Sequence, residues 1–391
     1  MKKEVYSEPN SRIAEQLYLK AIELDPEFAL AYTRYANLCT DFYWFYWDRT
    51  ESRLEKAKHY IDKSFELAPE SPEVYLALGK YYYHGYLDYD NALDAFQEGL
   101  NFDPDNGEIL EYIGYVKRRQ GKFTEAIEYF EKALEKDPAS AIVNETIGET
   151  YMLLRDYQKA SEYIDKAIYF SPEWGFPYQS RAKIYLLFNG DISSAKNFLQ
   201  NNLEIIINER DVVIERLLEI LKLNGDYEEA LDLLSNSSSK DIDDQFIFRP
   251  VEQLRAEIYY LQGNEKLKND NFLAAKSIIE NRLKDQPEDA RMHSALGLVY
   301  ARLGDKEKAI AEGKKGVELL PVTKEAWRGY FKELDLAKIY TIVGEYDLAI
   351  QKLDYLLSIP GELSVPYIKI DPVWKDLLEL PRMKEVFSKY E

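Results

Sequence analysis

Few residues in this chain have the types and spacing that catalysis or metal binding requires. His59, His84 and His293 lie in three separate segments, and no two of them stand at a metal-ligand spacing. Cys39 is the only cysteine, so the chain can form neither an internal disulfide nor a thiolate metal cluster. Neither a GxxxxGKS/T phosphate loop nor a GxGxxG motif occurs. The sequence therefore predicts a protein that is not an enzyme and has no catalytic residue, metal site or cofactor.

Residues suited to binding are easier to find, and the first set is basic. The phrase VKRRQGK, residues 116–122, is the densest basic cluster in the chain. Arg118 and Arg119 could hold a carboxylate or phosphate of a partner through paired hydrogen bonds. The alternative is that both cations only stabilise a helix C-terminus, where the helix dipole favours positive charge by about 0.3–1 kcal/mol.

The second set is aromatic. The stretch DFYWFYWDRT, residues 41–50, contains six aromatic side chains in succession. If the preceding helix continued through it at 100° per residue, half of them would extend the core face: Phe42, Tyr43 and Tyr46. The other three are candidates for a surface that contacts a partner: Trp44, Phe45 and Trp47.

Composition and charge narrow the classes of partner. The 391 residues carry 50 Lys and Arg against 70 Asp and Glu, a formal net charge of −20. A field of this sign disfavours nucleic acids and anionic lipid surfaces. No run of about 18 apolar residues occurs, and the first ten residues lack the apolar segment of a signal peptide. We therefore expect a cytoplasmic protein that binds neither nucleic acid nor membrane.

The elements that position these side chains follow from an internal repeat. The segment TEAIEYFEKALEKDP contains Ala126 and Ala133 and ends with Pro138. This pattern recurs along the chain, with its leading alanines mostly 34 or 35 residues apart. A small residue followed three positions later by tyrosine, as in Gly79 and Tyr82, precedes most copies. Each copy predicts a helix, a glycine-containing turn and a second helix that ends before proline.

These residues resemble the tetratricopeptide repeat, a helix–turn–helix of 34 residues. The resemblance covers nearly the whole chain and implies an all-α fold, an α-solenoid wound as a right-handed superhelix. We expect about nine full repeats, an N-terminal half repeat and a C-terminal capping helix pair. Repeat regularity divides the chain into three blocks: residues 1–200 with an aromatic insertion at 41–52, an irregular repeat and polar loop at 201–245, and residues 246–391 with the capping helices.

The order of the repeat variants carries a narrower resemblance. It lies in the phrases LYLKAIELDPEFALAY, YWFYWDRTESRLEKAKHYIDKSFELAP, RRQGKFTEAIEYFEKALEKDP and ARLGDKEKAIAEGKKGVELLP, and in the tail LSIPGELSVPYIKIDPVWKDLLELPRMKEVF. Together they are similar to the C-terminal repeat region of bacterial multidomain signalling proteins. There, such repeats follow an adenylate-cyclase, serine/threonine-kinase, winged-helix or TolB-like domain.

The first repeat supports the same interpretation, because it has only its second helix, Ser11 to Leu24. A solenoid that begins on a half repeat has an uncovered apolar end. We therefore expect the chain to be part of a longer signalling protein, unless residues 1–10 cover that end.

The inner face of the solenoid is where we expect a partner to bind. In this architecture the first helix of each repeat lines the concave surface. Helical phase places Tyr83 and His84 on that surface in the third repeat, and Tyr115, Arg118 and Arg119 in the fourth. We expect a non-catalytic interaction scaffold that binds a protein or peptide, or an attached effector domain. The alternatives are a sensory domain that holds a small ligand or peptide inside the superhelix, and a module for homo-oligomerisation.

Overall fold

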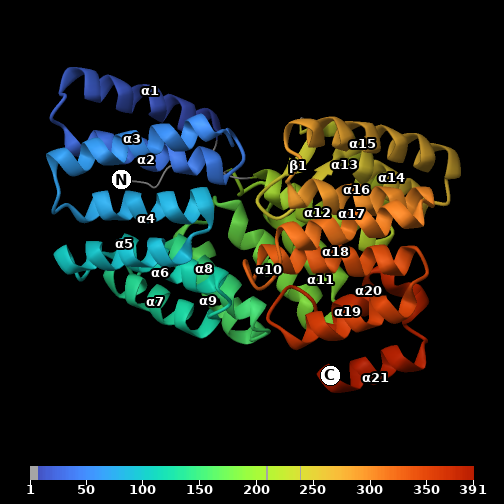
Figure 1. Cartoon of the computed structure of the whole chain (residues 1–391). Helices are drawn as coiled ribbons and strands as arrows, with labels where there is room; N and C mark the ends of the chain where they lie inside the picture. The colour runs from blue at the N-terminus through green and yellow to red at the C-terminus, as the bar shows by residue number, and fades with distance from the viewer. Residues whose placement is uncertain (1–7, 208–209, 238) are drawn as a thin grey trace. The chain divides into compact units, whose positions relative to one another are not determined.

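The computed structural model describes residues 8–207, 210–237 and 239–391, and helices form most of it (Figure 1). The chain divides into two compact units, Met1–Val143 and Asn144–Glu391, which we call unit 1 and unit 2. The boundary falls inside helix α8 (Ala141–Leu153).

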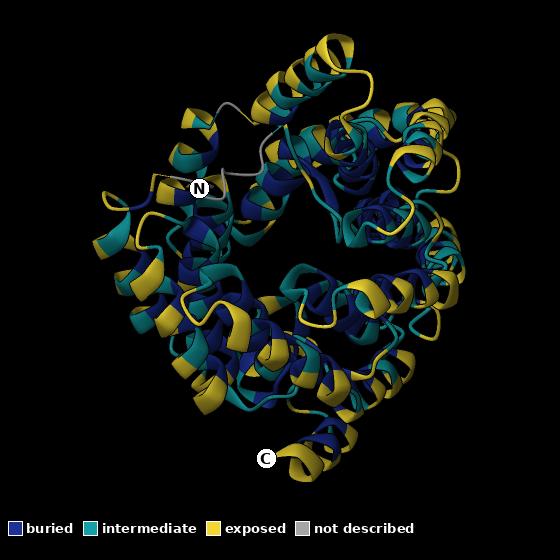
Figure 2. Cartoon of the chain, turned by 90° about the vertical axis from the view of Figure 1, so that its left-hand side faces the viewer, coloured by how far each residue is buried: buried dark blue, intermediate teal, exposed yellow. Residues whose placement is uncertain are grey.

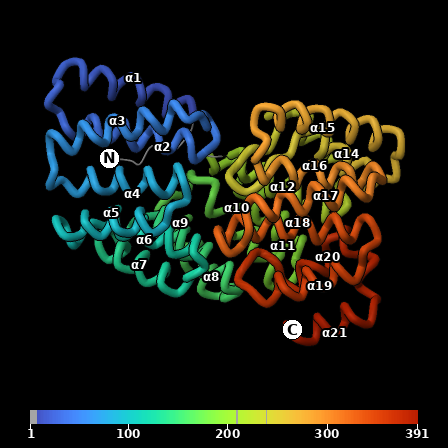
Figure 3. Tube along the Cα trace, in the orientation of Figure 1, coloured from blue at the N-terminus to red at the C-terminus, as the bar shows by residue number. Residues whose placement is uncertain are grey.

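Unit 1 is a stack of helical hairpins, followed as a tube in Figure 3. Its helices are α1 (Glu8–Leu24), α2 (Ala29–Trp44), α3 (Glu51–Leu67), α4 (Pro72–Tyr86), α5 (Tyr89–Phe102), α6 (Gly107–Arg119) and α7 (Phe123–Lys136).

Unit 2 continues the hairpins and adds a small antiparallel β-hairpin. Its elements after α8 are α9 (Tyr157–Phe170), α10 (Gly175–Asn189), α11 (Ile192–Asn202), α12 (Arg210–Asn224), α13 (Tyr227–Asn236), β1 (Asp241–Asp243), β2 (Phe248–Pro250), α14 (Val251–Leu261), α15 (Glu265–Asp285), α16 (Ala290–Leu303), α17 (Lys306–Leu319), α18 (Arg328–Ile342), α19 (Tyr346–Ser358), α20 (Val365–Ile370), the 3₁₀ helix η1 (Pro372–Leu377) and α21 (Pro381–Tyr390).

The order of these elements confirms the predicted all-α solenoid. Within the described residues, α1 is a lone second helix, and nine helix pairs follow it from α2–α3 to α18–α19. The segments α20, η1 and α21 then close the C-terminal end, where Trp374 of η1 is fully buried. The helices bury one face and expose the other, as Figure 2 shows by colour. Amphipathic hairpins that cover one another's apolar faces are what a repeat solenoid requires.

Small residues allow the paired helices to approach closely, as the repeat pattern predicted. A Cβ added to Gly79 of α4 would lie 2.1 Å from the ring of Phe96 in α5. The next repeat has the same arrangement, with Gly114 of α6 facing the ring of Phe130 in α7 at 2.5 Å. Only glycine leaves room for these rings, so the spacing of each pair is fixed by a glycine and an aromatic residue.

The turns inside the repeats contain a residue with a left-handed backbone conformation, that is, a positive φ. The five predicted turn glycines all have positive φ: Gly121, Gly225, Gly263, Gly304 and Gly344. Between α8 and α9 the same place is taken by Arg155, with φ of 63°. A side chain in this conformation costs roughly 1 kcal/mol relative to glycine.

Two local expectations from the sequence are corrected. Helix α2 ends at Trp44, and Tyr46 has φ of 61°, so the helix does not continue through the aromatic insertion and Tyr46 does not extend its core face. In the block 201–245, expected as an irregular repeat and a polar loop, residues 241–243 form strand β1, which pairs with β2 from Asp241 opposite Pro250 to Asp243 opposite Phe248. The division into blocks 1–200, 201–245 and 246–391 rests on repeat regularity and stays a prediction.

Unit 2 closes on itself through its C-terminal segment. The N–H of Gly361 donates to the carbonyl of Leu153 at 2.8 Å, and the hydroxyl of Ser364 donates to the carbonyl of Leu187 at 2.5 Å. Helix α20 packs against α10. We call this contact between residues 356–370 and α8–α10 the closing seam.

Candidate functional site

The first helices of the repeats in unit 1 bring four predicted residues together. The ring of Trp44, at the end of α2, stacks on His84 of α4 with centroids 4.6 Å apart and planes at 19°. Tyr83 lies against the same indole at 4.8 Å. The guanidinium carbon of Arg119, the last residue of α6, lies 5.2 Å from the Trp44 ring centroid, within the range of a cation–π interaction. We call these four residues the aromatic–arginine cluster.

The cluster is held by polar contacts as well as by stacking. Nε of Arg119 donates to the hydroxyl of Tyr83 at 3.1 Å. Beneath the rings, Nζ of Lys80 lies 2.9 Å from a carboxylate oxygen of Asp41, and Nδ1 of His84 lies 3.5 Å from the same oxygen. Three successive repeats therefore contribute to one network.

Burial sets the charges in this network. Burial by itself would raise the pKa of Asp41, but Lys80 and His84 outweigh it and hold the pKa below its ordinary value. Burial lowers the pKa of His84 to about 4, against the opposing effect of the nearby Asp41 carboxylate. The imidazole is therefore neutral at pH 7, and Asp41 and Lys80 form the charged pair.

The other four predicted residues lie beside the cluster. Phe45 and Trp47 are partly exposed and stack on each other at 5.1 Å, and Trp47 also meets Phe42 edge-on at 5.6 Å. The hydroxyl of Tyr115 donates to Glu111 at 2.5 Å, and the guanidinium of Arg118 lies 5.5 Å from the Tyr115 ring.

The eight predicted residues differ in exposure. The cluster residues Trp44, Tyr83, His84 and Arg119, together with Arg118, are between 2% and 6% exposed, whereas Phe45, Trp47 and Tyr115 are intermediate. Their role in contacting a partner stays a prediction.

The sequence pattern did not single out Tyr112, which joins this face. Lys80 lies 5.0 Å from the Tyr112 ring, and His84 lies 5.9 Å from it. Tyr112 precedes Tyr115 by three residues on α6, so the two are neighbours on that helix, and this spacing was the available signal.

Ion pairs that the sequence also left unnoticed link elements of unit 2. Lys183 of α10 pairs with Glu219 of α12 at 3.4 Å, and Lys222 of α12 pairs with Glu257 of α14 at 2.8 Å. Arg249 of β2 and Asp335 of α18 form a buried pair at 2.9 Å. Each cation faces an acid, so these pairs neutralise one another and offer no unbalanced charge to a ligand.

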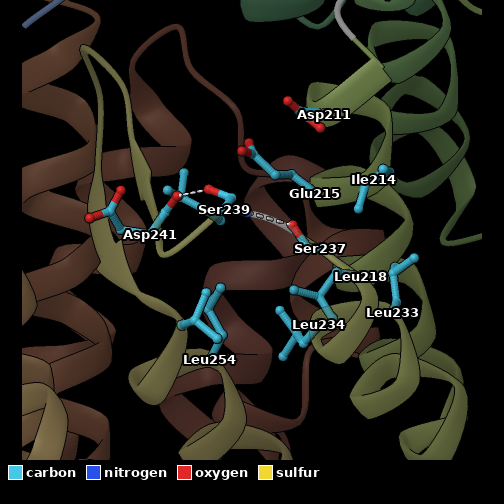
Figure 4. Close-up of a pocket in the computed structure, with 12 residues that line it drawn as sticks. Asp211, Ile214, Glu215, Leu218, Leu233, Leu234, Ser237, Ser239, Asp241 and Leu254 are labelled. Carbon is cyan, nitrogen blue, oxygen red and sulfur yellow. Dashed lines mark hydrogen bonds between the residues drawn. The ribbon is translucent and has the colours of Figure 1, made fainter. Parts of the chain in front are cut away.

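A small cavity lies between α12, α13 and the β-hairpin of unit 2 (Figure 4). Leu218, Leu234 and Leu254 line one side, and Glu215 and Asp211 lie at the other. Its volume of about 30 Å³ is enough for water but not for an organic ligand. Burial, with the nearby charge of Asp244, raises the pKa of Glu215 to about 8.

Two features are absent from the part of the chain that the structure describes. No group of three or more His, Cys, Asp or Glu residues there is arranged to hold a metal ion. No helix there combines the length and apolar composition needed to cross a bilayer.

Comparison with known proteins gives matches in sequence and in structure. Residues 117–180 and residues 260–322 each match a model of the tetratricopeptide repeat. None of the curated proteins compared with the chain matches it.

Three solved structures that are similar to this chain differ in how much of it they cover. The human IFIT1 dimer with m7Gppp-AAAA has a TM-score of 0.47 and 16% identity, over 81% of this chain and 69% of that chain. PilF of Pseudomonas aeruginosa has a TM-score of 0.41 and 16% identity, over 58% of this chain and 91% of that chain. YrrB has a TM-score of 0.35 and 20% identity, over 51% of this chain and 96% of that chain. It is described as a tetratricopeptide-repeat protein with an unusual peptide-binding site.

The two matched segments have the helix–turn–helix structure and the close helix pairing described above. They belong to a series of hairpins that runs from α2 to α19. The chain therefore contains tetratricopeptide repeats at residues 117–180 and 260–322, within an all-α solenoid fold.

Proposed function

We propose that the protein is a non-catalytic interaction scaffold, and that α2, α4 and α6 of unit 1 bind a segment of a partner protein. The observation that carries this proposal is the aromatic–arginine cluster. Trp, Tyr and Arg are the residue types that contribute most at protein interfaces. Here they are fixed by stacking and hydrogen bonds, so a partner would not have to order them.

The partly exposed pair Phe45 and Trp47 gives a partner access to this face. Phe45 packs against the same hydrophobic group as Trp44 and Tyr83. A partner segment with an apolar side chain over this pair would match the accessible, apolar part of the face. The narrower resemblance to the repeat region of bacterial signalling proteins supports an attached effector domain as that partner.

The experiment is a selection of random 12-residue peptides displayed on phage against the full chain. Selected peptides are then measured by fluorescence polarisation against three variants. The double variant Phe45→Ala/Trp47→Ala should weaken binding by tenfold or more, and Arg119→Lys should weaken it because lysine lacks the planar fork. The control Lys56→Glu reverses a charge at an exposed position of α3 and should leave binding unchanged. Peptides that bind all variants equally would show that this face is not the binding site.

Homo-oligomerisation is a second candidate, supported by α1. Three large apolar side chains along this helix are strongly exposed: Ile13 at 57%, Leu17 at 65% and Leu24 at 73%. Their spacing of four and seven residues places them along one side of the helix. Light scattering after size-exclusion chromatography tests this candidate: Leu17→Glu should convert a dimer to a monomer, and a monomeric wild-type chain would exclude it.

A further inference from the structure

The hairpin of strands β1 and β2 ends in a short tip that packs on two first helices of unit 2. The tip is residues 243–247, Asp-Asp-Gln-Phe-Ile, and the helices are α16 and α18. Asp243 is exposed and the other four tip residues are partly buried, so the tip lies at the surface of the fold and not in its core. A two-stranded hairpin is at best marginally stable by itself. Its position therefore depends on its contacts with the helices.

Two arginines hold the acidic side of the hairpin. Arg282 of α15 contacts the carboxylates of Asp241 and Asp243 at 2.5 and 2.9 Å. These two acids project from the same face of β1, because side chains alternate along a strand. Arg291 of α16 contacts the other carboxylate oxygen of Asp243 at 2.7 Å and also donates to the main-chain carbonyl of Asp244. The helices therefore bind two carboxylates and one main-chain carbonyl of the hairpin.

Helix α18 holds the other side of the tip through an aromatic residue. The ring centroid of Phe246 lies 4.7 Å from that of Trp327 and 5.2 Å from that of Phe331. Nζ of Lys332 donates to the main-chain carbonyl of Phe246 at 2.7 Å. The Lys332 side chain is fully buried, and a buried ammonium group requires an acceptor. Phe246 therefore supplies both an aromatic ring and a main-chain acceptor.

These contacts are of the kind that hold a peptide ligand. Arginine clusters bind acidic motifs, and aromatic side chains anchor segments at protein interfaces. Asp244 shapes the turn between the two features, because its carboxylate accepts from the N–H groups of Phe246 and Ile247 at 2.7 and 2.8 Å. The pattern that the helices bind is therefore an acid, Asp243, followed three positions later by an aromatic residue, Phe246, across a tight turn.

We propose that the tip occupies a second interaction surface of the protein as an intramolecular ligand. The five residues of this surface lie on α15, on α16 and at the start of α18: Arg282, Arg291, Trp327, Phe331 and Lys332. The partner that fits it is a segment of another protein in which an acidic residue is followed three positions later by an aromatic one.

Such a segment takes the place of the tip, while strand β2 stays in the core through the fully buried Phe248. The tip thereby limits binding to partners that compete with a tethered copy of the same motif. The surface lies wholly in unit 2, so it does not depend on the interaction face proposed in unit 1.

Peptide binding to an opened chain tests this proposal. In the full chain the tip is replaced by Gly-Ser-Gly-Ser-Gly, which removes the intramolecular ligand and keeps all five surface residues; we call this chain the open variant. The probe is a fluorescein-labelled peptide with the sequence of residues 240–247, KDIDDQFI, and fluorescence polarisation measures its affinity. The open variant should bind it at least tenfold more tightly than wild type, because a tethered tip competes at a high effective concentration. Absence of binding, or equal binding by the two chains, would overturn the proposal.

Altered peptides test the chemistry of recognition. In the peptide, Asp241→Asn/Asp243→Asn removes the charges that the arginines bind, and Phe246→Ala removes the aromatic anchor. Each change should lower the affinity for the open variant at least tenfold. A peptide of the same composition in scrambled order is the control for unspecific attraction between charges, and it should bind as weakly as the altered peptides. Equal affinity of all these peptides would contradict the proposed motif.

Two substitutions in the open variant locate the site. Phe331→Ala removes one of the rings against which the anchor packs, so it should weaken peptide binding at least tenfold. The matched control is Phe170→Ala, the same change at the end of α9, where the side chain is 41% exposed and lies outside this surface. It should leave the affinity unchanged. Equal affinity of the two variants would place the peptide elsewhere and would refute the assignment.

Circular dichroism follows folding, and Phe246→Ala in the otherwise intact chain is the milder change. This variant should keep the fold and should bind the peptide more tightly than wild type, because it weakens only the contact of the tip itself. Loss of folding in both the open variant and Phe246→Ala would also overturn the proposal, because a ligand that a partner displaces cannot be required for the fold.

Discussion

Arg119 donates a hydrogen bond of 3.1 Å to the hydroxyl of Tyr83, 36 residues earlier in the chain. The two residues lie near the ends of α6 and α4, and both contact the indole of Trp44 at the end of α2. One hydrogen bond and two ring contacts therefore join the first helices of three successive repeats. In a solenoid each repeat is stabilised mainly by its neighbours, so such bridges contribute to stability as well as to a binding face.

Tyr83→Phe should lower the free energy of unfolding by about 1 kcal/mol, because a buried hydrogen bond from Arg119 loses its acceptor. Urea unfolding followed by circular dichroism measures the change. The control Tyr169→Phe removes a hydroxyl from a strongly exposed residue and should have no effect. Equal stability of Tyr83→Phe and wild type would show that the bond contributes nothing.

His84 should make the fold sensitive to acid. Its pKa is lowered, chiefly by burial, from 6.5 to about 4, with Asp41, Lys80 and Arg119 as the charged groups around it. Between these values the unfolded chain binds a proton that the folded chain does not, so stability falls as the pH is lowered through this window. The shift corresponds to a loss of about 3 kcal/mol.

Urea unfolding at pH 7 and pH 4.5 tests the role of His84. The stability lost between these pH values should be smaller in His84→Gln than in wild type. His293 is a control of opposite sign: burial would lower its pKa, but hydrogen bonds to Glu312 and the Pro287 carbonyl raise it above 6.5. Its contribution is present below pH 6.5 and is lost as the pH rises, so His293→Gln should increase the loss on acidification. A His84→Gln variant as acid-sensitive as wild type would contradict the assignment.

Glu215 should destabilise the fold as the pH rises above about 4.5. Burial and the charge of Asp244 raise its pKa from 4.5 to about 8. The unfolded chain releases this proton at lower pH than the folded chain does, so stability decreases as the pH rises from 4.5 to about 8. Glu215→Gln should therefore be more stable than wild type at pH 8 and equal to it at pH 4. Thermal unfolding at the two pH values measures both, and a variant destabilised at pH 8 would refute the expected direction.

Gly79→Ala should destabilise unit 1 by about 1–3 kcal/mol, because the added methyl group meets the ring of Phe96. The melting temperature and the urea midpoint should both fall. The double variant Gly79→Ala/Phe96→Leu replaces the ring by a smaller side chain and should recover part of the loss. A neutral Gly79→Ala variant would mean that α4 and α5 can separate without cost.

Most of the fold was predictable because it depends on spacing along the chain. Small residues, turn glycines and terminal prolines recur at a nearly constant interval, and each copy specifies the same hairpin by local contacts. Helical phase also assigned Tyr83 and His84 to one predicted surface, and the structure places both rings against Trp44. The early end of α2 did not follow, because the left-handed conformation of Tyr46 is not encoded by a glycine.

The sequence by itself determined the hairpins and their number, since periodicity acts within a repeat and between neighbouring repeats. Only the tertiary structure decided which distant residues meet. The bond from Arg155 to the carbonyl of Leu363 spans 208 positions, and the hydroxyl of Tyr367 bonds Glu219 across 148. Such contacts depend on the rotation that accumulates from one repeat to the next. A small displacement of any helix changes that rotation, so local patterns in the sequence do not predict the contacts. The closing seam, formed by residues that no local pattern connects, could therefore be found only in three dimensions.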